Sequence, residues 1–200
     1  MIYHRRKLMM ALSILLLLLS FVIALSFGTI NIPLSEVARS LFLTPLNSQN
    51  LLVIEQIRLP RAFLAMIVGA LLGICGAATQ GLFRNPLADP SLIGVSAGAS
   101  VGAAVVIFFS GSLLSLYSIS GVALISFGAF LGGTITVILV YKLATNHNGT
   151  SVATMLLAGI AVTAIAGGIT SITEFFADSE VLRRISLWRM GGLDLSLIHI

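Results

Sequence analysis

Two arginines, Arg58 and Arg61, flank Leu59-Pro60 directly before a long uncharged stretch of the sequence. A guanidinium is planar and pairs with a carboxylate through two parallel hydrogen bonds, so a close arginine pair suits an acidic partner. The alternative is that both side chains anchor a membrane helix, with their methylene groups in lipid and their charges in water. The residues alone leave both roles open.

A compact polar turn, Arg84-Asn85-Pro86-Leu87-Ala88-Asp89-Pro90, separates this uncharged stretch from the next one. Asn85 and Asp89 each precede a proline, which disfavours helical geometry at both positions. Asp89 is therefore placed to cap the following helix, with Pro90 at its first position. The turn predicts a junction between two helices.

The sequence lacks the residue patterns of common catalytic and metal sites. No Gly-x-x-x-x-Gly-Lys-Ser/Thr pattern occurs, so the chain does not bind ATP through a P-loop. His4, His147 and His199 are far apart, and Cys75, the single cysteine, is expected to be a small buried apolar residue. We therefore expect no catalytic residue, no cofactor and no metal, which disfavours an intramembrane enzyme.

Composition indicates a membrane protein. The chain has 200 residues, of which 58% are hydrophobic and 9% are charged. Ordinary globular proteins carry roughly 25% charged residues, so this chain has too few to cover a water-exposed surface. The net charge of +4 is small and scattered, which argues against nucleic acid as a partner. We expect a polytopic protein in contact with the lipid bilayer.

The elements that position the polar residues are helices that cross the bilayer, each of which needs about 20 apolar residues. The uncharged runs predict spans at residues 8–27, 62–83, 91–109, 119–141 and 151–172. A polar connector with a short helix from Pro33 joins the first two spans, and residues 47–50 are expected to form a loop within it. Turns are expected at residues 110–118 and 142–150.

The first apolar run has two interpretations. One is a cleaved signal peptide, but the run is long for that, and residues 24–28 form a poor cleavage site. The other is a retained span with a cytoplasmic N-terminus, favoured by the basic residues 5–7 before it. We expect the second topology, in which the turns at 84–90 and 142–150 are cytoplasmic and the arginine pair lies outside.

Glycines recur at helical spacing in the two spans around the polar turn. They are Gly69, Gly73 and Gly76, with Gln80 at the end of that stripe, and then Gly94, Gly98 and Gly102. Small residues at such spacing let helix backbones approach closely inside a bilayer. The stripes therefore predict close packing between helices.

The predicted interior of the membrane domain is free of charge. No Asp, Glu, Lys, Arg or His occurs in residues 62–83, 90–141 or 151–173. Transporters that are coupled to protons or sodium usually carry acidic or histidine side chains inside the membrane. If the chain transports a solute, its energy source is expected to lie outside the membrane.

Taken in order, these motifs resemble the FecCD family, the type II ABC importer permeases for iron–siderophore, heme and vitamin B12. The family pattern is RLPR, a glycine-rich span, Q-G-x-x-x-N-P-L-A-x-P and L-G-V-x-x-G-A, and the chain follows it at residues 58–61, 80–90 and 93–99. The resemblance continues through residues 156–159 and 186–193, so it covers nearly the whole chain. Residues 195–200 depart from it.

The resemblance implies an all-α polytopic membrane protein, the N-terminal half of a ten-helix type II ABC importer permease, with about five transmembrane helices plus short periplasmic helices. Residues 1–200 then form a single partial transmembrane permease domain. The cytoplasmic segment that the family presents to its ATPase is expected to be missing from it.

The resemblance also implies roles for the polar residues outside the membrane. Arg58 and Arg61 are expected to dock acidic residues of a periplasmic or lipid-anchored substrate-binding protein. Asn85 and Leu87 are expected to border the cytoplasmic gate of the pathway.

A second gate loop and a pathway-lining helix follow from the same resemblance. The family carries small hydroxyl residues before its fifth span, and Thr150 and Ser151 are nearest, although Val152 stands at one expected hydroxyl position. The fifth span, with Gly159, is expected to line the pathway, while packing alone would also explain its small residues.

The expected function is that of a permease subunit, not an enzyme, in an ATP-driven importer of an iron chelate, either a ferric siderophore or heme. The implied partners are ATP-binding cassette ATPase subunits, the binding protein, and a second permease copy in a homodimer or heterodimer. The implied location is the bacterial inner membrane. The alternatives are a vitamin B12 importer permease and a helix-packing or channel-type membrane protein without such transport.

Overall fold

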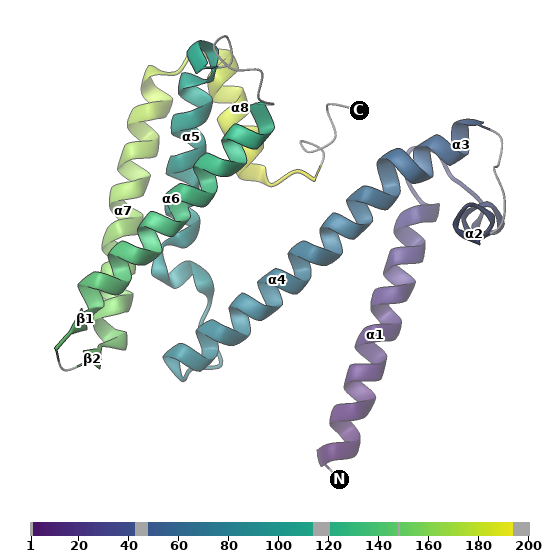
Figure 1. The fold of residues 1–200 in the computed structure, drawn as a ribbon, viewed down its shortest axis with the longest axis horizontal. Coiled ribbons are helices and arrows are strands. Elements are labelled where there is room, and N and C mark those ends of the chain that lie inside the picture. Colours follow the sequence, from purple (N-terminus) through teal and green to yellow (C-terminus); the bar gives the residue numbers. More distant parts are fainter. Residues whose placement is uncertain (1, 43–47, 114–120, 148, 194–200) are drawn as a thin grey trace. The chain divides into compact units, whose positions relative to one another are not determined.

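The computed structural model describes residues 2–42, 48–113, 121–147 and 149–193. The described chain is helical apart from one small hairpin, and it divides into two compact units with their boundary in α4, between Ala70 and Leu71. Figure 1 follows the elements in chain order. Each unit is considered by itself below.

The first unit contains one long helix, a connector and the beginning of a second long helix. Its elements are α1 (Ile2–Ser26), α2 (Leu34–Phe42), α3 (Ser48–Leu52), the π-helix η1 (Val53–Arg58) and the first part of α4 (Leu59–Phe83). The last three follow one another without a break, so the helix of the second span begins well before residue 62. The loop that the sequence predicts for residues 47–50 is wrong at residues 48–50, and Asn47 lies outside the described residues.

The π-helical turn immediately precedes a proline. The backbone N–H of Leu59 donates to the carbonyl of Ile54, five residues earlier, which is the wide π pattern. Pro60 has no N–H, and in a regular α-helix its ring would clash with the carbonyl four residues before it. The wider turn lets the helix continue through this position. Such π turns are frequent at functional sites.

A small apolar core joins the end of α1 to the connector and η1. It is formed by Leu25, Ile32, Val37, Ile54 and Ala62, all of which are buried. The rings of Phe21 and Phe63 meet edge to face, with 5.5 Å between their centroids. The core therefore holds one end of α1 against the start of α4.

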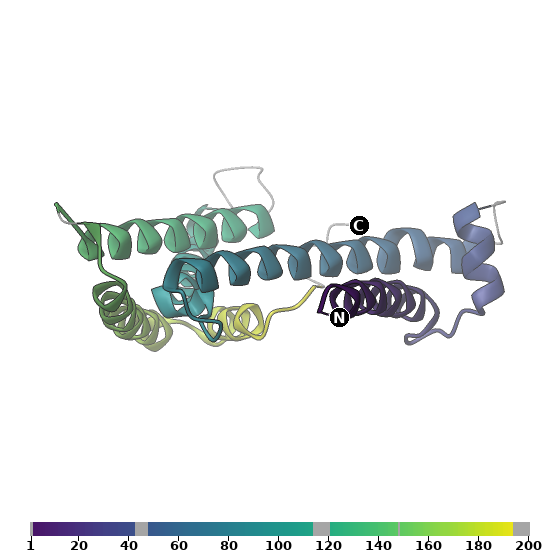
Figure 2. The same ribbon diagram turned by 90° about the horizontal axis from the view of Figure 1, so that it is seen from below.

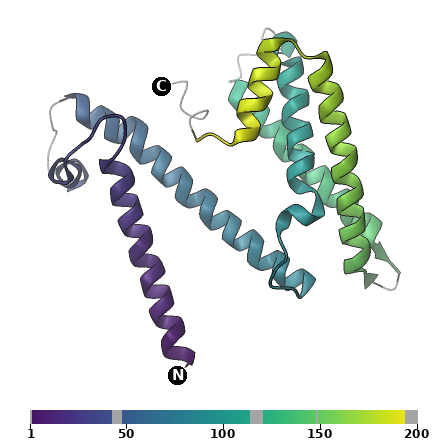
Figure 3. The same cartoon turned by 180° about the vertical axis from the view of Figure 1, so that it is seen from behind.

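The second unit is a helical bundle. After the end of α4 it contains the 3-10 helix η2 (Pro90–Ile93), α5 (Val95–Leu113), α6 (Gly121–Ala144), the strands β1 (Thr145–Asn146) and β2 (Gly149–Thr150), α7 (Val152–Phe176) and α8 (Ser179–Met190). α6 and α7 pack along α5, and α8 packs against α5 as well, as Figure 3 shows from behind. Thr145 pairs with Thr150 in the antiparallel hairpin that joins α6 to α7.

Two apolar clusters close the ends of this bundle. Near the hairpin, Phe83 and Ala88 pack with Val140, Ala144 and Met155. A second cluster holds α8 on α5, where Ile185 is buried with Ala104 and Ile107. The interior of the bundle between them is made largely of small residues.

The described helices have the lengths that a membrane requires. Four of them are long and apolar enough to cross a bilayer, namely Tyr3–Ser26, the continuous helix Asn50–Phe83, Gly121–Ala144 and Val152–Phe176. A fifth apolar helix, Val95–Phe109, is shorter. The all-α fold is confirmed. The spans of the sequence analysis correspond to α1, α4, α5, α6 and α7, and their placement in a bilayer stays a prediction.

Candidate functional site

Arg58 is the last residue of η1, and its half-buried side chain contacts the backbone of its own chain. Its Nη1 donates to the carbonyl oxygen of Leu25 at 2.6 Å, and its Nη2 donates to the carbonyl oxygen of Ile30. Both acceptors lie far earlier in the sequence, at the end of α1 and in the connector. Arg58 therefore ties these segments to η1.

The carbonyl of Leu25 explains why such a tie is stable. The last carbonyls of a helix have no partner within it, and a basic side chain satisfies one of them while it complements the helix dipole. The next carbonyl, that of Ser26, accepts from the backbone N–H of Ile32 at 3.0 Å. Gly28 leaves room for the guanidinium, because a Cβ at this position would lie only 3.0 Å from Nη2 of Arg58.

Arg61 lies in the first turn of α4 and is also half-buried. It lies three residues after Arg58 on a continuous helix, so the predicted docking pair sits where α4 begins. Docking by both arginines stays a prediction, and for Arg58 it has to be weighed against the carbonyl contacts.

The first predicted gate turn, residues 84–90, is tightly hydrogen-bonded. α4 ends in a Schellman motif, in which Arg84 N–H donates to Gly81 O and Asn85 N–H donates to Gln80 O. Asn85 then accepts a hydrogen bond on Oδ1 from the backbone N–H of Leu87 at 2.9 Å. The side chain of Leu87 is 87% exposed at the tip of this turn.

Asp89 caps the four-residue 3-10 helix η2, whereas the sequence predicts that it caps the third span itself, which as α5 begins only at Val95. Its Oδ1 accepts from the backbone N–H of Ser91 at 2.7 Å, and Pro90 follows at the first helical position. Hydrogen bonds from the Ser91 side chain and backbone hold the pKa of Asp89 below its ordinary value. The carboxylate is therefore charged at neutral pH and fixes the start of η2.

The second predicted gate segment contains a small cluster of hydroxyl groups. The Oγ1 atoms of Thr145 and Thr150 are 3.0 Å apart across the hairpin. Ser151 caps α7 by accepting from the backbone N–H of Thr154 at 3.3 Å, and its Oγ is 3.0 Å from Thr154 Oγ1. Thr145 and Thr154 were missed from the sequence, although the turn at residues 142–150 indicated that Thr145 could face Thr150.

The two predicted gate turns lie together in the second unit. Phe83 and Ala88, at either side of the first turn, belong to the same buried cluster as Val140, Ala144 and Met155 from α6 and α7. Figure 2 shows the hairpin extending from the ends of α6 and α7. The structure thus brings together two polar turns that are more than 50 residues apart in the sequence.

The glycines of α5 form a close contact with a second glycine stripe in α6. A Cβ at Gly98 would lie 2.6 Å from the carbonyl oxygen of Gly132, and a Cβ at Gly102 would lie 2.8 Å from the carbonyl carbon of Gly128. Both distances are too short for any side chain, so the two backbones touch. Gly128 and Gly132 were missed in the sequence, although their spacing of four residues was visible.

Gly94 and Gly159 meet where η2 and α5 cross α7. Gly94 adopts φ of 73°, which favours glycine, and a Cβ on it would lie 3.3 Å from the carbonyl oxygen of Gly159. A Cβ at Gly159 would lie 3.1 Å from Ile93 Cα. Gly159, which the sequence places on the pathway, thus serves helix packing in this unit.

The glycines of α4 differ from those of α5. A Cβ at Gly69, Gly73 or Gly76 would find open space, with no atom within 4 Å among the described residues. Gln80 at the end of this stripe is exposed, and its carbonyl accepts from the backbone N–H of Asn85. Cys75 on the same helix is exposed, so its predicted burial is wrong for the described chain.

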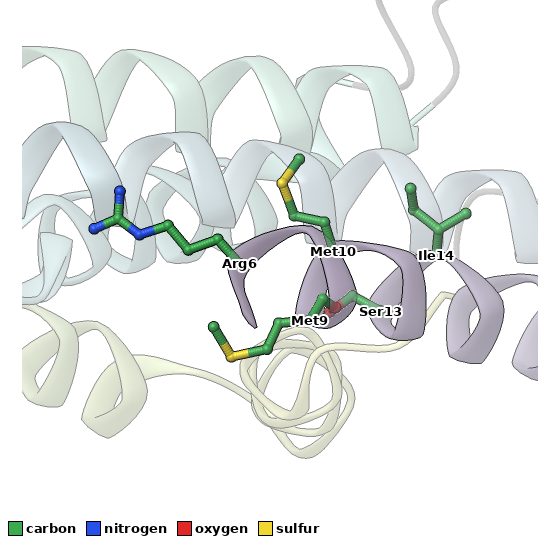
Figure 4. Close-up of a pocket in the computed structure, with 5 residues that line it drawn as sticks. All are labelled: Arg6, Met9, Met10, Ser13 and Ile14. Carbon is green, nitrogen blue, oxygen red and sulfur yellow. The ribbon is translucent and has the colours of Figure 1, made fainter. Parts of the chain in front are cut away.

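Other features of the described residues do not form a site. A depression of about 410 Å³ is lined by Arg6, Met9, Met10, Ser13 and Ile14, all from α1, as Figure 4 shows. All five lining residues belong to one helix, and the lining is almost entirely apolar, so the depression offers no set of polar groups for a ligand. Within the described chain, no group of His, Cys, Asp and Glu is arranged to hold a metal ion.

Comparison with known proteins places these features in a family. Residues 16–198 match the FecCD transport family. A hemin transport system permease from Yersinia pestis is 40% identical over 180 residues, which cover 88% of this chain and 52% of the relative. A cobalamin import permease from Halobacterium salinarum is 42% identical over 147 residues, which cover 74% of this chain and 37% of the relative.

Relatives of lower sequence identity are also transport proteins. A molybdate import permease from Haemophilus influenzae is 33% identical over 190 residues, which cover 91% of this chain and 53% of the relative. A solved structure described as an inward-facing metal-chelate type ABC transporter superposes with a TM-score of 0.74 at 29% identity, and covers 94% of this chain and 54% of that chain. The chain spans about half the length of the curated relatives it matches. With a match over residues 16–198, it belongs to the FecCD transport family.

Proposed function

We propose that this chain is part of the permease subunit of an ATP-driven, binding-protein-dependent importer in a bacterial inner membrane, with its N-terminus in the cytoplasm. The observation that carries the proposal is a glycine-packed bundle without a charged residue in 90–141 and 151–173, with two hydrogen-bonded polar turns at one end. Such a bundle offers no proton- or sodium-coupling group. It suits a path whose opening is driven from outside the membrane.

The partners in this proposal follow from the family. They are two ATPase subunits, a periplasmic or lipid-anchored binding protein, and a second permease copy in a homodimer or heterodimer. The turn with Asn85 and Leu87 and the turn with Thr150 and Ser151 would form the cytoplasmic gate. Their shared apolar cluster supports this, because the cluster is closely packed and movement of one turn would shift the side chains that pack against the other.

We propose an iron chelate, either heme or a ferric siderophore, as the substrate class. Support comes from the similarity to the hemin permease over 88% of the chain. A cobalamin permease is the second candidate, favoured by the 42% identity over 147 residues with the cobalamin import permease from Halobacterium salinarum. These substrates are distinguished by measuring whether the cognate binding protein binds heme, a ferric siderophore or cobalamin.

The importer itself is tested by purification and uptake. The permease complex carrying this chain should co-purify with an ATPase subunit, and uptake should stop when that subunit cannot hydrolyse ATP. A protein that only packs helices or forms a channel would purify without an ATPase. Uptake that persists without ATP hydrolysis would reject the proposal.

Docking of the binding protein by Arg58 and Arg61 is tested by charge reversal. Replacing both with glutamate places like charges across the interface, which can cost several kcal/mol, so affinity should fall strongly, and more so at low salt. Acidic-to-arginine changes in the binding protein should restore part of it. Normal membrane insertion with unchanged affinity would reject docking, and poor insertion without rescue would support anchoring.

A further inference from the structure

The inference concerns how Arg58 becomes available to a partner, and it rests on the docking role proposed above. In the structure the two terminal nitrogens of Arg58 donate to the carbonyls of Leu25 and Ile30. These are the same nitrogens that would form a bidentate pair with a carboxylate. A docking partner therefore has to replace the carbonyl contacts in order to use this side chain fully.

Replacement is favourable on general grounds. Hydrogen bonds from a guanidinium to an ionised carboxylate are about twice as strong as hydrogen bonds between neutral groups. The Arg58 side chain is half-buried, so a partner carboxylate can approach it from the solvent side. The two carbonyls are then left to water or to other donors.

Loss of the carbonyl contacts of Arg58 affects the segment between α1 and α2. The Leu25 and Ile30 carbonyls lie on either side of Gly28, so Arg58 fastens both ends of this short stretch to η1. We propose that Arg58 exchanges between these carbonyls and a carboxylate of the binding protein. Docking then removes the contacts that hold the end of α1 to η1 and the start of α4. The relative position of these two helices can therefore change when the binding protein docks.

Gly28 offers a way to test the exchange without changing any charge. A Cβ at Gly28 would lie 3.0 Å from Nη2 and 3.3 Å from Cζ of Arg58, both at the far end of a flexible side chain. Gly28 is outside the left-handed region, so its backbone tolerates alanine. Alanine should therefore crowd the guanidinium, which has to move by a few tenths of an ångström, and weaken its contact with the Ile30 carbonyl, so that Arg58 becomes more available.

The experiment measures affinity for the cognate binding protein in the assembled permease complex in nanodiscs. Gly28→Ala should tighten binding by at most about tenfold, which is the size expected if one competing hydrogen bond were lost completely. The matched control is Gly69→Ala, where a Cβ meets nothing within 4 Å among the described residues, and it should leave affinity unchanged. In an Arg58→Gln background, Gly28→Ala should have no effect on affinity.

A second readout follows the internal contacts directly. Hydrogen exchange of the 27–32 segment should become faster when the binding protein docks, and in Gly28→Ala it should be fast already before docking. The Ile32 amide, which donates to Ser26 O at 3.0 Å, is the reporter within it.

The outcomes separate the exchange from the docking role on which it rests. If Arg58→Gln weakens docking but Gly28→Ala leaves affinity and exchange unchanged or weakens binding, the exchange is wrong and docking stands. If Arg58→Gln and Arg61→Gln both leave affinity unchanged, the docking role fails, and the exchange fails with it. Tighter binding in Gly28→Ala that persists in the Arg58→Gln background would assign the effect to Gly28 itself and overturn the exchange.

Discussion

At the scale of single residues, the polar turns combine side-chain caps with one unfavourable backbone conformation. Arg84 has φ of 50° and is the one non-glycine residue with positive φ among the residues that the structure describes. It occupies the position of a Schellman motif where glycine is preferred, because a side chain in this region clashes with the following carbonyl. The turn therefore keeps an arginine at a conformational cost.

This cost predicts the effect of substitutions at Arg84. Arg84→Gly should increase the free energy of unfolding by about 1 kcal/mol or less, and so raise the thermal unfolding midpoint in detergent. Glycine relieves the clash, but it also loses more backbone entropy on folding, so the gain is small. Arg84→Asn, which tolerates the same geometry, controls for the lost charge and should be close to the wild type. Arg84→Val should be less stable than all three. Equal midpoints for glycine and valine would contradict the observed conformation.

At the scale of elements, glycines with the same spacing have different surroundings. Those of α5 touch the backbone of α6, whereas those of α4 face open space in the described chain. Gly102→Ala should therefore lower stability by about 1–3 kcal/mol, the usual cost of overpacking. Gly73→Ala, the matched control, should leave it unchanged or slightly higher, because alanine favours helix. The measurement is the thermal unfolding midpoint of both variants. An equal loss of stability in both would contradict the difference in packing between the two sets of glycines.

The same elements show what the sequence could and could not predict. Uncharged runs predict the long helices, and Asp89 with Pro90 predicts that a helix starts at residue 90, because these signals are local. The helix over residues 48–58 was missed, since polar residues there indicate a loop and only packing of Ile54 into the core reveals the helix. The contacts of Arg58 could not be predicted either, because its acceptors lie 33 and 28 positions earlier.

At the scale of the whole molecule, the expected topology places the arginine pair outside and the two predicted gate turns in the cytoplasm. Basic residues 5–7 precede α1 and favour a cytoplasmic N-terminus. One crossing by α1 would then place the connector outside. Crossings by α4, α5 and α6 would return the chain, so we expect the β1–β2 hairpin in the cytoplasm.

This topology predicts the labelling of single cysteines by a membrane-impermeant maleimide, after Cys75 is replaced by alanine. His147 is exposed in the hairpin and Asn31 is exposed in the connector, so both sites are accessible to the reagent. His147→Cys should react only in inside-out vesicles, because no charged residue between Pro90 and Tyr141 would stop α5 and α6 from lying in lipid. Asn31→Cys should react only in intact spheroplasts. Reaction of both cysteines from one side would contradict the number of crossings, and exchanged sides would reverse the orientation of the whole domain.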